Sequence, residues 1–268
     1  MKVVLFCGGL GTRLREHSDT IPKPLVNIGP RPIIWHLMRY YAHFGHRDFI
    51  LCLGYRGDLI REFFLNYSPF TGADFTLSGG TPRLLEQTTD VPDWSITFVE
   101  TGLHTNIGGR LGAVERHVSA EPMFLANYSD QLSDLPLPEY VNAFEKSGAV
   151  AGFASVRPSY SSHSASVDDS GLVTTIDPMS AADVWINGGY FVMRPEIFRH
   201  MRLGEELVEE PFRRLVTERR LYSMRYTGFW KAMDTFKDKI TYDRMWGVGD
   251  TPWQVWRSRS KAGSDAAN

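Results

Sequence analysis

The first 150 residues alternate short apolar runs with segments of helical periodicity. The runs at Val3–Phe6 and Asp48–Leu53 are typical of buried strands. Between them, apolar residues recur at helical spacing from about Pro32, which suits a first helical turn, to Gly45, which suits the residue after a helix. This alternation is typical of a parallel, doubly wound sheet with helices on both faces. In such sheets, ligands bind at the carboxyl ends of the strands.

The same patterns predict the other elements. Strands are expected at 95–99, 123–127, 149–157, 172–176, 186–193 and 221–226, and helices at 59–65, 111–118, 138–146, 195–201, 205–219 and 235–246. The serine-rich stretch at 159–166 has turn signals and little periodicity, and no repeat or linker divides the sequence. We predict one domain of residues 1–256, with halves 1–148 and 149–256 and a flexible tail at 257–268.

The composition excludes several classes of function. The 268 residues carry a net charge of −2, which gives no electrostatic reason to bind nucleic acid or a membrane surface. No apolar stretch approaches the roughly 20 residues of a membrane span, and no signal peptide is recognised. Cys7 and Cys52 lie in apolar runs and are expected to be buried thiols in a reducing compartment. We therefore expect a cytoplasmic protein.

A glycine-rich segment follows the first strand and contains Gly8, Gly9 and Gly11. Glycine lets the backbone approach a ligand closely, and the amides of such a turn can hold phosphate oxygens. Arg13 and Lys23 add two cations nearby. The segment lacks the Lys-Ser/Thr pair of a P-loop and the third glycine of a dinucleotide fingerprint. It favours triphosphate binding, with a plain strand-to-helix turn as the alternative.

Several motifs in order resemble the sugar-phosphate nucleotidyltransferase family, and most of all its glucose-1-phosphate cytidylyltransferases. The segment GGLGTRL at 8–14 and PKPL at 22–25 resemble the family signature. Further matching segments lie at 32–36, 54–57, 101–102, 108–111, 186–192, 210–211 and 228–235, so the resemblance runs to about residue 256. It implies a Rossmann-like, GT-A-like doubly wound mixed sheet, with a nucleotide-binding half at 1–148 and a smaller β-rich acceptor-binding half at 149–256.

The resemblance also implies a reaction. An acceptor phosphate attacks the α-phosphorus of a nucleoside triphosphate, and pyrophosphate leaves, so positioning and charge neutralisation carry the catalysis. Arg13 would hold the β- and γ-phosphates, and Lys23 would neutralise the α-phosphate. The turn with Gly8, Gly9, Gly11 and Thr12 would contact the nucleotide. Gly109 and Arg110 match the region near the base in cytidylyltransferases, which favours CTP.

Asp130 and Asp234 match the two carboxylates that hold Mg²⁺ in this family, and Asp130 also belongs to the nucleotide site. Two carboxylates at strand ends suit a hard, oxygen-preferring cation. Each aspartate could instead cap a following helix, and Lys23, between two prolines, could be a solvated loop charge. We prefer the metal interpretation because both carboxylates lie inside matched motifs.

The acceptor half departs from the family pattern. The stretch Thr175–Ser180 stands where the family has a Glu-Lys-Pro element, and no lysine occurs between Lys146 and Lys231. The sequence Ser-His-Ser at 162–164 replaces an Arg-Phe-Gly element, and Ser129–Gln131 replaces Gly-Asp-Gly around the metal carboxylate. The nucleotide half therefore resembles the family more closely than the acceptor half.

Asn187 and Gly188 match the acceptor-side strand, and Arg157, His163 and Arg194 are cations that could hold an acceptor phosphate. Three accounts stay open: an atypical phosphate or phosphonate acceptor, a sugar 1-phosphate held by a relocated cation, and a silent nucleotide-binding homologue acting as a sensor or partner subunit. We favour an active enzyme, because both phosphate-binding cations and both metal carboxylates are present. A homo-oligomer is expected, and segment 71–93 is interpreted as a lid or an intersubunit arm.

Overall fold

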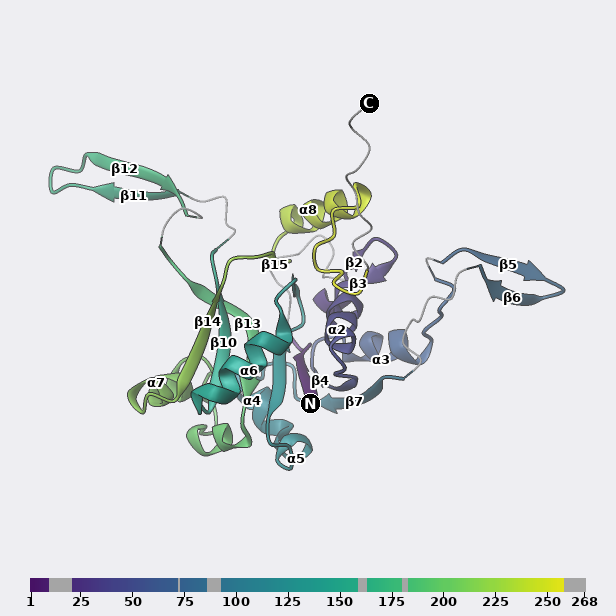
Figure 1. Ribbon diagram of the computed structural model, residues 1–268, viewed down its shortest axis with the longest axis horizontal. Helices are drawn as coiled ribbons and strands as arrows, with labels where there is room; N and C mark the ends of the chain where they lie inside the picture. The colour runs from purple at the N-terminus through teal and green to yellow at the C-terminus, as the bar shows by residue number, and fades with distance from the viewer. Residues whose placement is uncertain (10–20, 72, 86–92, 159–162, 180–182, 258–268) are drawn as a thin grey trace.

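The computed structural model describes residues 1–9, 21–71, 73–85, 93–158, 163–179 and 183–257. A seven-stranded sheet crosses the centre of the molecule in the order β14-β10-β13-β8-β1-β4-β7 (Figure 1). Its strands are β1 (Lys2–Phe6), β4 (Asp48–Leu53), β7 (Ser95–Glu100), β8 (Phe124–Tyr128), β10 (Ala151–Val156), β13 (Ile186–Met193) and β14 (Leu221–Tyr226). Strand β13 runs antiparallel to its neighbours β8 and β10, while the other pairings are parallel. The predicted α/β fold with a mixed sheet is confirmed.

Helices cover both faces of this sheet. One face carries α2 (Ile33–His43), α3 (Gly57–Leu65), α6 (Leu137–Ser147) and α8 (Phe236–Gly247), and the other carries α4 (Ile107–Ala113), α5 (Glu115–Val118), η3 (Pro195–His200) and α7 (Glu210–Thr217). Side chains alternate between the two faces along β1, so this strand contributes to the cores on both sides of the sheet. Val3 and Leu5 pack into one core, and Val4 and Phe6 pack into the other. Both halves of the chain contribute strands to this single sheet.

Short elements shape the loops at the carboxyl edge of the sheet. Strand β2 (Asn27–Ile28) pairs with β3 (Arg31–Pro32), β9 (Gln131–Ser133) pairs with β15 (Trp230–Ala232), and η2 spans Lys23–Leu25. The β9–β15 pair joins the two halves of the chain a second time. It therefore brings together two loops that are far apart in the sequence.

Three predicted helices differ from the observed ones. The helix expected at 205–219 is shorter, because α7 begins only where Pro211 fits the first helical turn. The helix expected at 111–118 is divided into α4 and α5, and α4 begins early because the side chain of Asn106 caps its first turn. The segment expected at 195–201 is the 3-10 helix η3.

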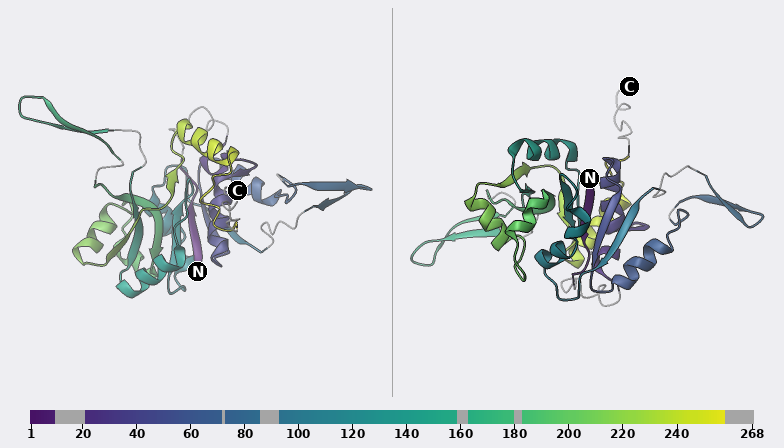
Figure 2. Two further views of the ribbon diagram at one scale, coloured as in Figure 1. Left: turned by 45° about the horizontal axis from the view of Figure 1, so that its top comes forward. Right: turned by 90° about the horizontal axis from the view of Figure 1, so that it is seen from below.

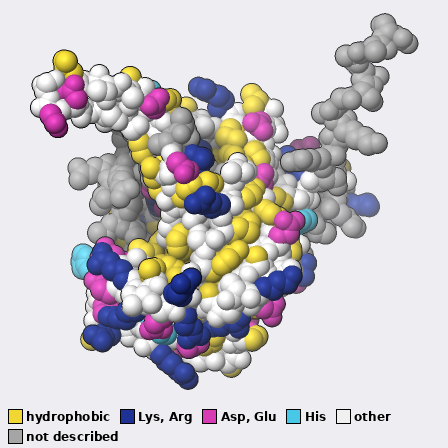
Figure 3. Space-filling view, turned by 60° about the vertical axis from the view of Figure 1, so that its left-hand side comes forward, with side chains coloured by type: hydrophobic (Ala, Val, Ile, Leu, Met, Phe, Trp, Pro, Cys, Tyr) yellow, Lys and Arg dark blue, Asp and Glu magenta, His cyan; other side chains and the backbone are white. Residues whose placement is uncertain are grey.

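Two hairpins project from the body on opposite sides (Figures 1 and 2). One consists of β5 (Phe75–Ser78) and β6 (Thr81–Leu84), and the other of β11 (His163–Val167) and β12 (Val173–Pro178). Figure 3 shows the β11–β12 hairpin standing clear of the body. Both expose large apolar side chains, namely Phe75 and Leu77 on the first and Val167, Leu172, Val173 and Ile176 on the second.

The segment after α8 packs against α2 around a buried histidine. The Nε2–H of His36 donates to the carbonyl of Ile28 at 3.0 Å, and the indole N–H of Trp253 donates to Nδ1 at 3.4 Å. Trp246 and Trp256 also contact the imidazole ring. Both ring nitrogens are thus engaged by the neutral form, and burial lowers the pKa of His36 to about 4.

This histidine should make the fold sensitive to acid. In the unfolded chain the imidazole of His36 is protonated near its usual pKa of 6.5, whereas in the folded chain its pKa is about 4. The free energy of unfolding therefore falls as the pH falls between these two values. Between pH 7 and pH 5, the free energy of unfolding should fall about 2 kcal/mol more in the wild type than in His36→Gln. Urea unfolding at both pH values measures this, with exposed His104→Gln as control. Equal pH slopes for wild type and His36→Gln would contradict the assignment.

Candidate active site

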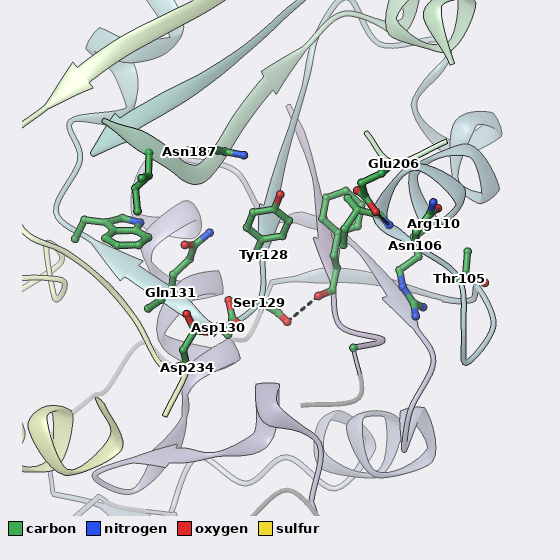
Figure 4. A pocket seen from close by; sticks show the side chains of 16 residues that line it. Thr105, Asn106, Arg110, Tyr128, Ser129, Asp130, Gln131, Asn187, Glu206 and Asp234 are labelled. Atoms are coloured by element: carbon green, nitrogen blue, oxygen red, sulfur yellow. Dashed lines mark hydrogen bonds between the residues drawn. The ribbon is translucent and has the colours of Figure 1, made fainter. Parts of the chain in front are cut away.

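A pocket of about 430 Å³ lies at the carboxyl ends of β1 and β8 and at the start of β13 (Figure 4). The hydroxyl of Ser129 donates to the carbonyl of Phe6 at 2.8 Å and so joins the ends of β1 and β8. In Figure 4, Asp130 and Asp234 point toward one another on one side of the pocket, and Asn106 and Glu206 lie on the other. The side chains that line it include Tyr128, Asp130, Gln131, Asn187, Glu206, Trp230 and Asp234.

Lys23 joins the two aspartates. Its ammonium lies 2.5 Å from Oδ2 of Asp130 and 2.8 Å from Oδ1 of Asp234. Lys23 belongs to η2, Asp130 follows β8, and Asp234 follows β15. The β9–β15 pair and a 2.8 Å bond from the backbone N–H of Met233 to the carbonyl of Asp130 hold the two carboxylates side by side. The structure thus assembles three of the residues that the sequence singled out.

The alternative roles considered for these residues are wrong. The cap of α8 is Thr235, which forms a reciprocal capping box with Asp238, so the carboxylate of Asp234 is left to Lys23. Asp130 is followed by strand β9 rather than by a helix. Only 14% of the Lys23 side chain is exposed, so it is not a solvated loop charge.

The two carboxylates also determine the charge state of Lys23. Burial alone would lower the pKa of its ammonium, but the charges of Asp130 and Asp234 and their hydrogen bonds outweigh burial and hold the pKa above its usual value. Lys23 is therefore a permanent cation at neutral pH. Its positive charge lies at the pocket edge, between two acceptor-only side chains.

Arg110 is buried beneath the glycine turn and is only 3% exposed. Its guanidinium donates to the carbonyls of Gly8 at 2.9 Å and Leu53 at 3.2 Å and to the hydroxyl of Thr101 at 2.6 Å. It therefore ties together the ends of β1, β4 and β7. A Cβ on Gly8 would overlap the guanidinium, so Arg110 itself demands glycine there. Burial lowers the pKa of Arg110, although an arginine stays charged.

The rest of the nucleotide segment is described only in part. Gly9 lines the pocket, and the N–H of Gly109 donates to the side chain of Asn106 at 2.8 Å. Gly11, Thr12 and Arg13 lie outside the described residues, so their predicted roles stay predictions. The two cysteines, Cys7 and Cys52, are free and buried, as expected.

The acceptor-side residues lie at the start of β13. The side chain of Asn187 lines the pocket and accepts the N–H of Gly189 at 2.8 Å. The indole N–H of Trp230 donates to the carbonyl of Gly188 at 2.9 Å. Gly189 has a φ of 71°, and a Cβ there would overlap Gln131. Tight packing against the neighbouring loops thus fixes this corner of the pocket.

The three cations considered for the acceptor lie in different places. Arg157 follows β10, and its guanidinium is 3.3 Å from the carboxylate of Asp183. His163 is exposed on the projecting strand β11. Arg194 follows the far end of β13 and donates to the carbonyl of Ala149 at 3.1 Å, so the fold does not bring it to the pocket.

Sequence reasoning missed Tyr128 and Glu206, which line the pocket from β8 and from the loop before α7. The carboxylate of Glu206 accepts the N–H of Ile107 at 3.2 Å, and burial raises its pKa. The pattern around Glu206 predicted a helix, so no sequence signal set this residue apart.

Among the described residues, no helix is long and apolar enough to cross a membrane.

Comparison with known proteins places this chain in a family. The family model described as nucleotidyl transferase matches residues 2–230. The chain is 36% identical over 259 residues to the probable glucose-1-phosphate cytidylyltransferase of Bacillus subtilis (strain 168). The aligned region covers 96% of this chain and 100% of that protein. It is 34% identical over 258 residues to glucose-1-phosphate cytidylyltransferase of Salmonella typhi, with the same coverage.

Solved structures share the fold at low sequence identity. UDP-glucose pyrophosphorylase complexed with UDP-glucose gives a TM-score of 0.67 at 13% identity over 92% of this chain and 98% of that chain. HddC from Yersinia pseudotuberculosis gives 0.63 at 19% identity over 91% and 99%. The resemblance inferred from the motifs is thereby confirmed. The chain belongs to the nucleotidyl transferase family and is a nucleotidyltransferase.

Proposed function

We propose that the protein transfers CMP from CTP to the phosphate of a small phosphorylated acceptor of the sugar 1-phosphate class, with release of pyrophosphate. The observation that carries the proposal is Lys23, held between Asp130 and Asp234 at the edge of a pocket beside the glycine turn. Relatives that span nearly the whole chain are named glucose-1-phosphate cytidylyltransferases, which supports cytosine and a sugar 1-phosphate.

The reaction is a substitution at the α-phosphorus. An oxygen of the acceptor phosphate forms a bond to that phosphorus, and the bond from it to the oxygen of the β-phosphate breaks. The electron pair leaves with pyrophosphate. Because the nucleophile is already an anion, no side chain has to remove a proton. Lys23 lowers the repulsion between the two phosphates, and Arg13 is proposed to hold the departing pyrophosphate.

Asp130 and Asp234 fit a Mg²⁺ ion. Their carboxylates already enclose one cation, the ammonium of Lys23, at 2.5 and 2.8 Å. Within the described ranges no group of three metal-ligating side chains gathers, but Mg²⁺ needs only one or two carboxylates besides phosphates and water. The two aspartates would hold the ion, which supplies positive charge next to the phosphate oxygens when bound.

The nucleotide is proposed to contact the turn at Gly8 and Gly9, with Gly109 and Arg110 on the base side. On the acceptor side, Asn187 and Gly188 offer polar groups at the start of β13. Arg157 and His163 are proposed to contact the acceptor. An atypical phosphate or phosphonate acceptor and a sugar 1-phosphate held by a relocated cation are both compatible with the divergence of this half of the chain.

The proposal is tested by pyrophosphate release from each of the four nucleoside triphosphates, with Mg²⁺ and a panel of sugar 1-phosphates, polyol phosphates and phosphonates. CTP should support the highest rate, and Asp130→Asn should reduce it on the order of 10²-fold or more. The matched control is Asp243→Asn, which removes a carboxylate paired with Lys239 on α8. Tight CTP binding without turnover of any acceptor would favour the silent homologue instead.

We also propose that the protein is a homo-oligomer. The two projecting hairpins expose apolar side chains, for example Leu77 at 65% and Ile176 at 68%. Apolar surface on projecting arms is stabilised when a partner covers it. Light scattering that gave the mass of a single chain at micromolar concentration would refute this.

A further inference from the structure

Two arginines contact the ring of one tryptophan beside the acceptor end of the pocket. The guanidinium carbons of Arg157 and Arg225 lie 4.9 and 5.1 Å from the ring centroid of Trp185. The carboxylate of Asp183 contacts Arg157 at 3.3 Å and accepts the indole N–H of Trp185 at 3.1 Å. We call these four residues the arginine cluster. With two guanidinium groups and one carboxylate, it carries a net positive charge.

The arginine cluster and the pocket lie at the same height along the strands of the sheet. Across β13, β10 and β14, Asn187 is paired with Ser155 and Ser155 with Arg225. Asn187 lines the pocket, and Trp185 lies two residues before it. The cluster therefore continues the acceptor wall outward from the pocket. Figure 3 shows basic side chains among apolar ones on the face below the β11–β12 hairpin.

The Arg225 end of the cluster lies away from the two carboxylates of the pocket. Asp130 follows β8, and Arg225 lies on β14, three strands away in the sheet. At the usual spacing of strands this is a separation of about 14 Å between backbones. An anion bound at Arg225 therefore belongs to the end of the acceptor opposite the phosphate that attacks.

The chemistry of the cluster suits an anion. A guanidinium that lies over an indole ring keeps its N–H groups in its own plane, pointing away from the contact, where they can bind a carboxylate or phosphate in a bidentate way. Contact with Trp185 restrains both arginine side chains in advance, which reduces the entropy lost on binding. Asp183 is 80% exposed, so an incoming anion can displace it from Arg157 at little cost.

We propose that the arginine cluster binds a second anionic group, a carboxylate or a phosphate, at the remote end of the acceptor. This rests on the proposed transfer of CMP and narrows its acceptor. The preferred substrate is then a sugar 1-phosphate that carries a second negative group, rather than one whose only charged group is the 1-phosphate.

The test compares three acceptors with CTP and Mg²⁺: glucose 1-phosphate, glucuronic acid 1-phosphate and glucose 1,6-bisphosphate. In the wild type, kcat/KM for at least one of the two anionic acceptors should exceed that for glucose 1-phosphate by about tenfold or more, since a charge-assisted hydrogen bond contributes at least that factor. Arg157→Gln and Arg225→Gln should each remove most of this ratio. Which acceptor wins distinguishes a carboxylate from a phosphate.

Arg83→Gln, on the exposed face of β6, is the matched control and should leave the ratio unchanged. The proposal is overturned if neither anionic acceptor is preferred, or if the two cluster variants lower kcat/KM for all three acceptors equally. Calorimetric binding of glucose 1,6-bisphosphate and glucose 1-phosphate separates it from the proposed function. Arg225-dependent preference for the bisphosphate without any turnover would support the cluster and refute the transfer reaction, whereas no preference in binding or turnover would refute the cluster.

Discussion

Replacing Lys23 with methionine is expected to reduce CTP-dependent pyrophosphate release on the order of 10³-fold, the largest effect of any single change considered. Methionine keeps much of the length of the side chain but removes the charge that lies between Asp130 and Asp234. A preorganised charge next to a phosphate in transfer contributes on the order of 10²–10³ in rate. The measurement is kcat with saturating CTP and Mg²⁺.

The same variant separates a chemical role from a folding defect. Without the ammonium, Asp130 and Asp234 repel each other, and a divalent cation can take its place. Mg²⁺ should therefore raise the melting temperature of Lys23→Met more than that of the wild type. The control is Lys239→Met, which removes a lysine paired with Asp243 at 2.5 Å on α8 and should keep full activity. Retention of more than a tenth of the rate in Lys23→Met would refute the role given to this lysine.

Arg110→Gln is expected to lower the free energy of unfolding by about 3 kcal/mol in the absence of any nucleotide. The substitution leaves buried hydrogen-bond acceptors unpaired that the guanidinium satisfies in the wild type. These acceptors are the carbonyls of Gly8 and Leu53 and the hydroxyl of Thr101. Urea unfolding measures the loss. Arg116→Gln, an exposed arginine on α5, should change stability by less than about 0.5 kcal/mol.

The experiment also decides between two roles for Arg110. If it mainly recognises cytosine, the variant should unfold at the wild-type urea concentration and lose selectivity for CTP over UTP. If Arg110 mainly holds the strand ends together, the free energy of unfolding of the variant should fall. Its apparent affinity should then fall equally for all nucleotides, because the turn at Gly8 moves. The burial of its guanidinium favours the second result.

Local sequence patterns were sufficient for most of the sheet. The runs that became β1 and β4 are apolar on both faces, as expected for strands covered by helices on both sides. The triad of Lys23, Asp130 and Asp234 was harder, since its members are far apart in the sequence. Only the matched motifs pointed to them, and no periodicity would have joined them.

Other features depend on contacts that no single segment encodes. The two projecting hairpins carry little periodicity because most of their side chains face solvent on both sides. Arg110 occupied a motif associated with the base, and only the folded chain reveals that its guanidinium faces three strand ends. Trp185 could be recognised as aromatic, but its two arginines come from β14 and from the segment after β10. Such placements follow from tertiary pairing rather than from local preference.

The position of β13 in the sheet has a consequence for how the chain folds and how it can be divided. Because β13 lies between β8 and β10, residues 1–148 alone would end their sheet at β8, with a buried apolar strand exposed along its hydrogen-bonding edge. Exposed edges of this kind promote pairing between chains. Cutting the gene between the halves should therefore yield aggregates instead of a nucleotide-binding fragment, and a growing chain cannot join β10 to β8 until β13, which ends at Met193, has left the ribosome.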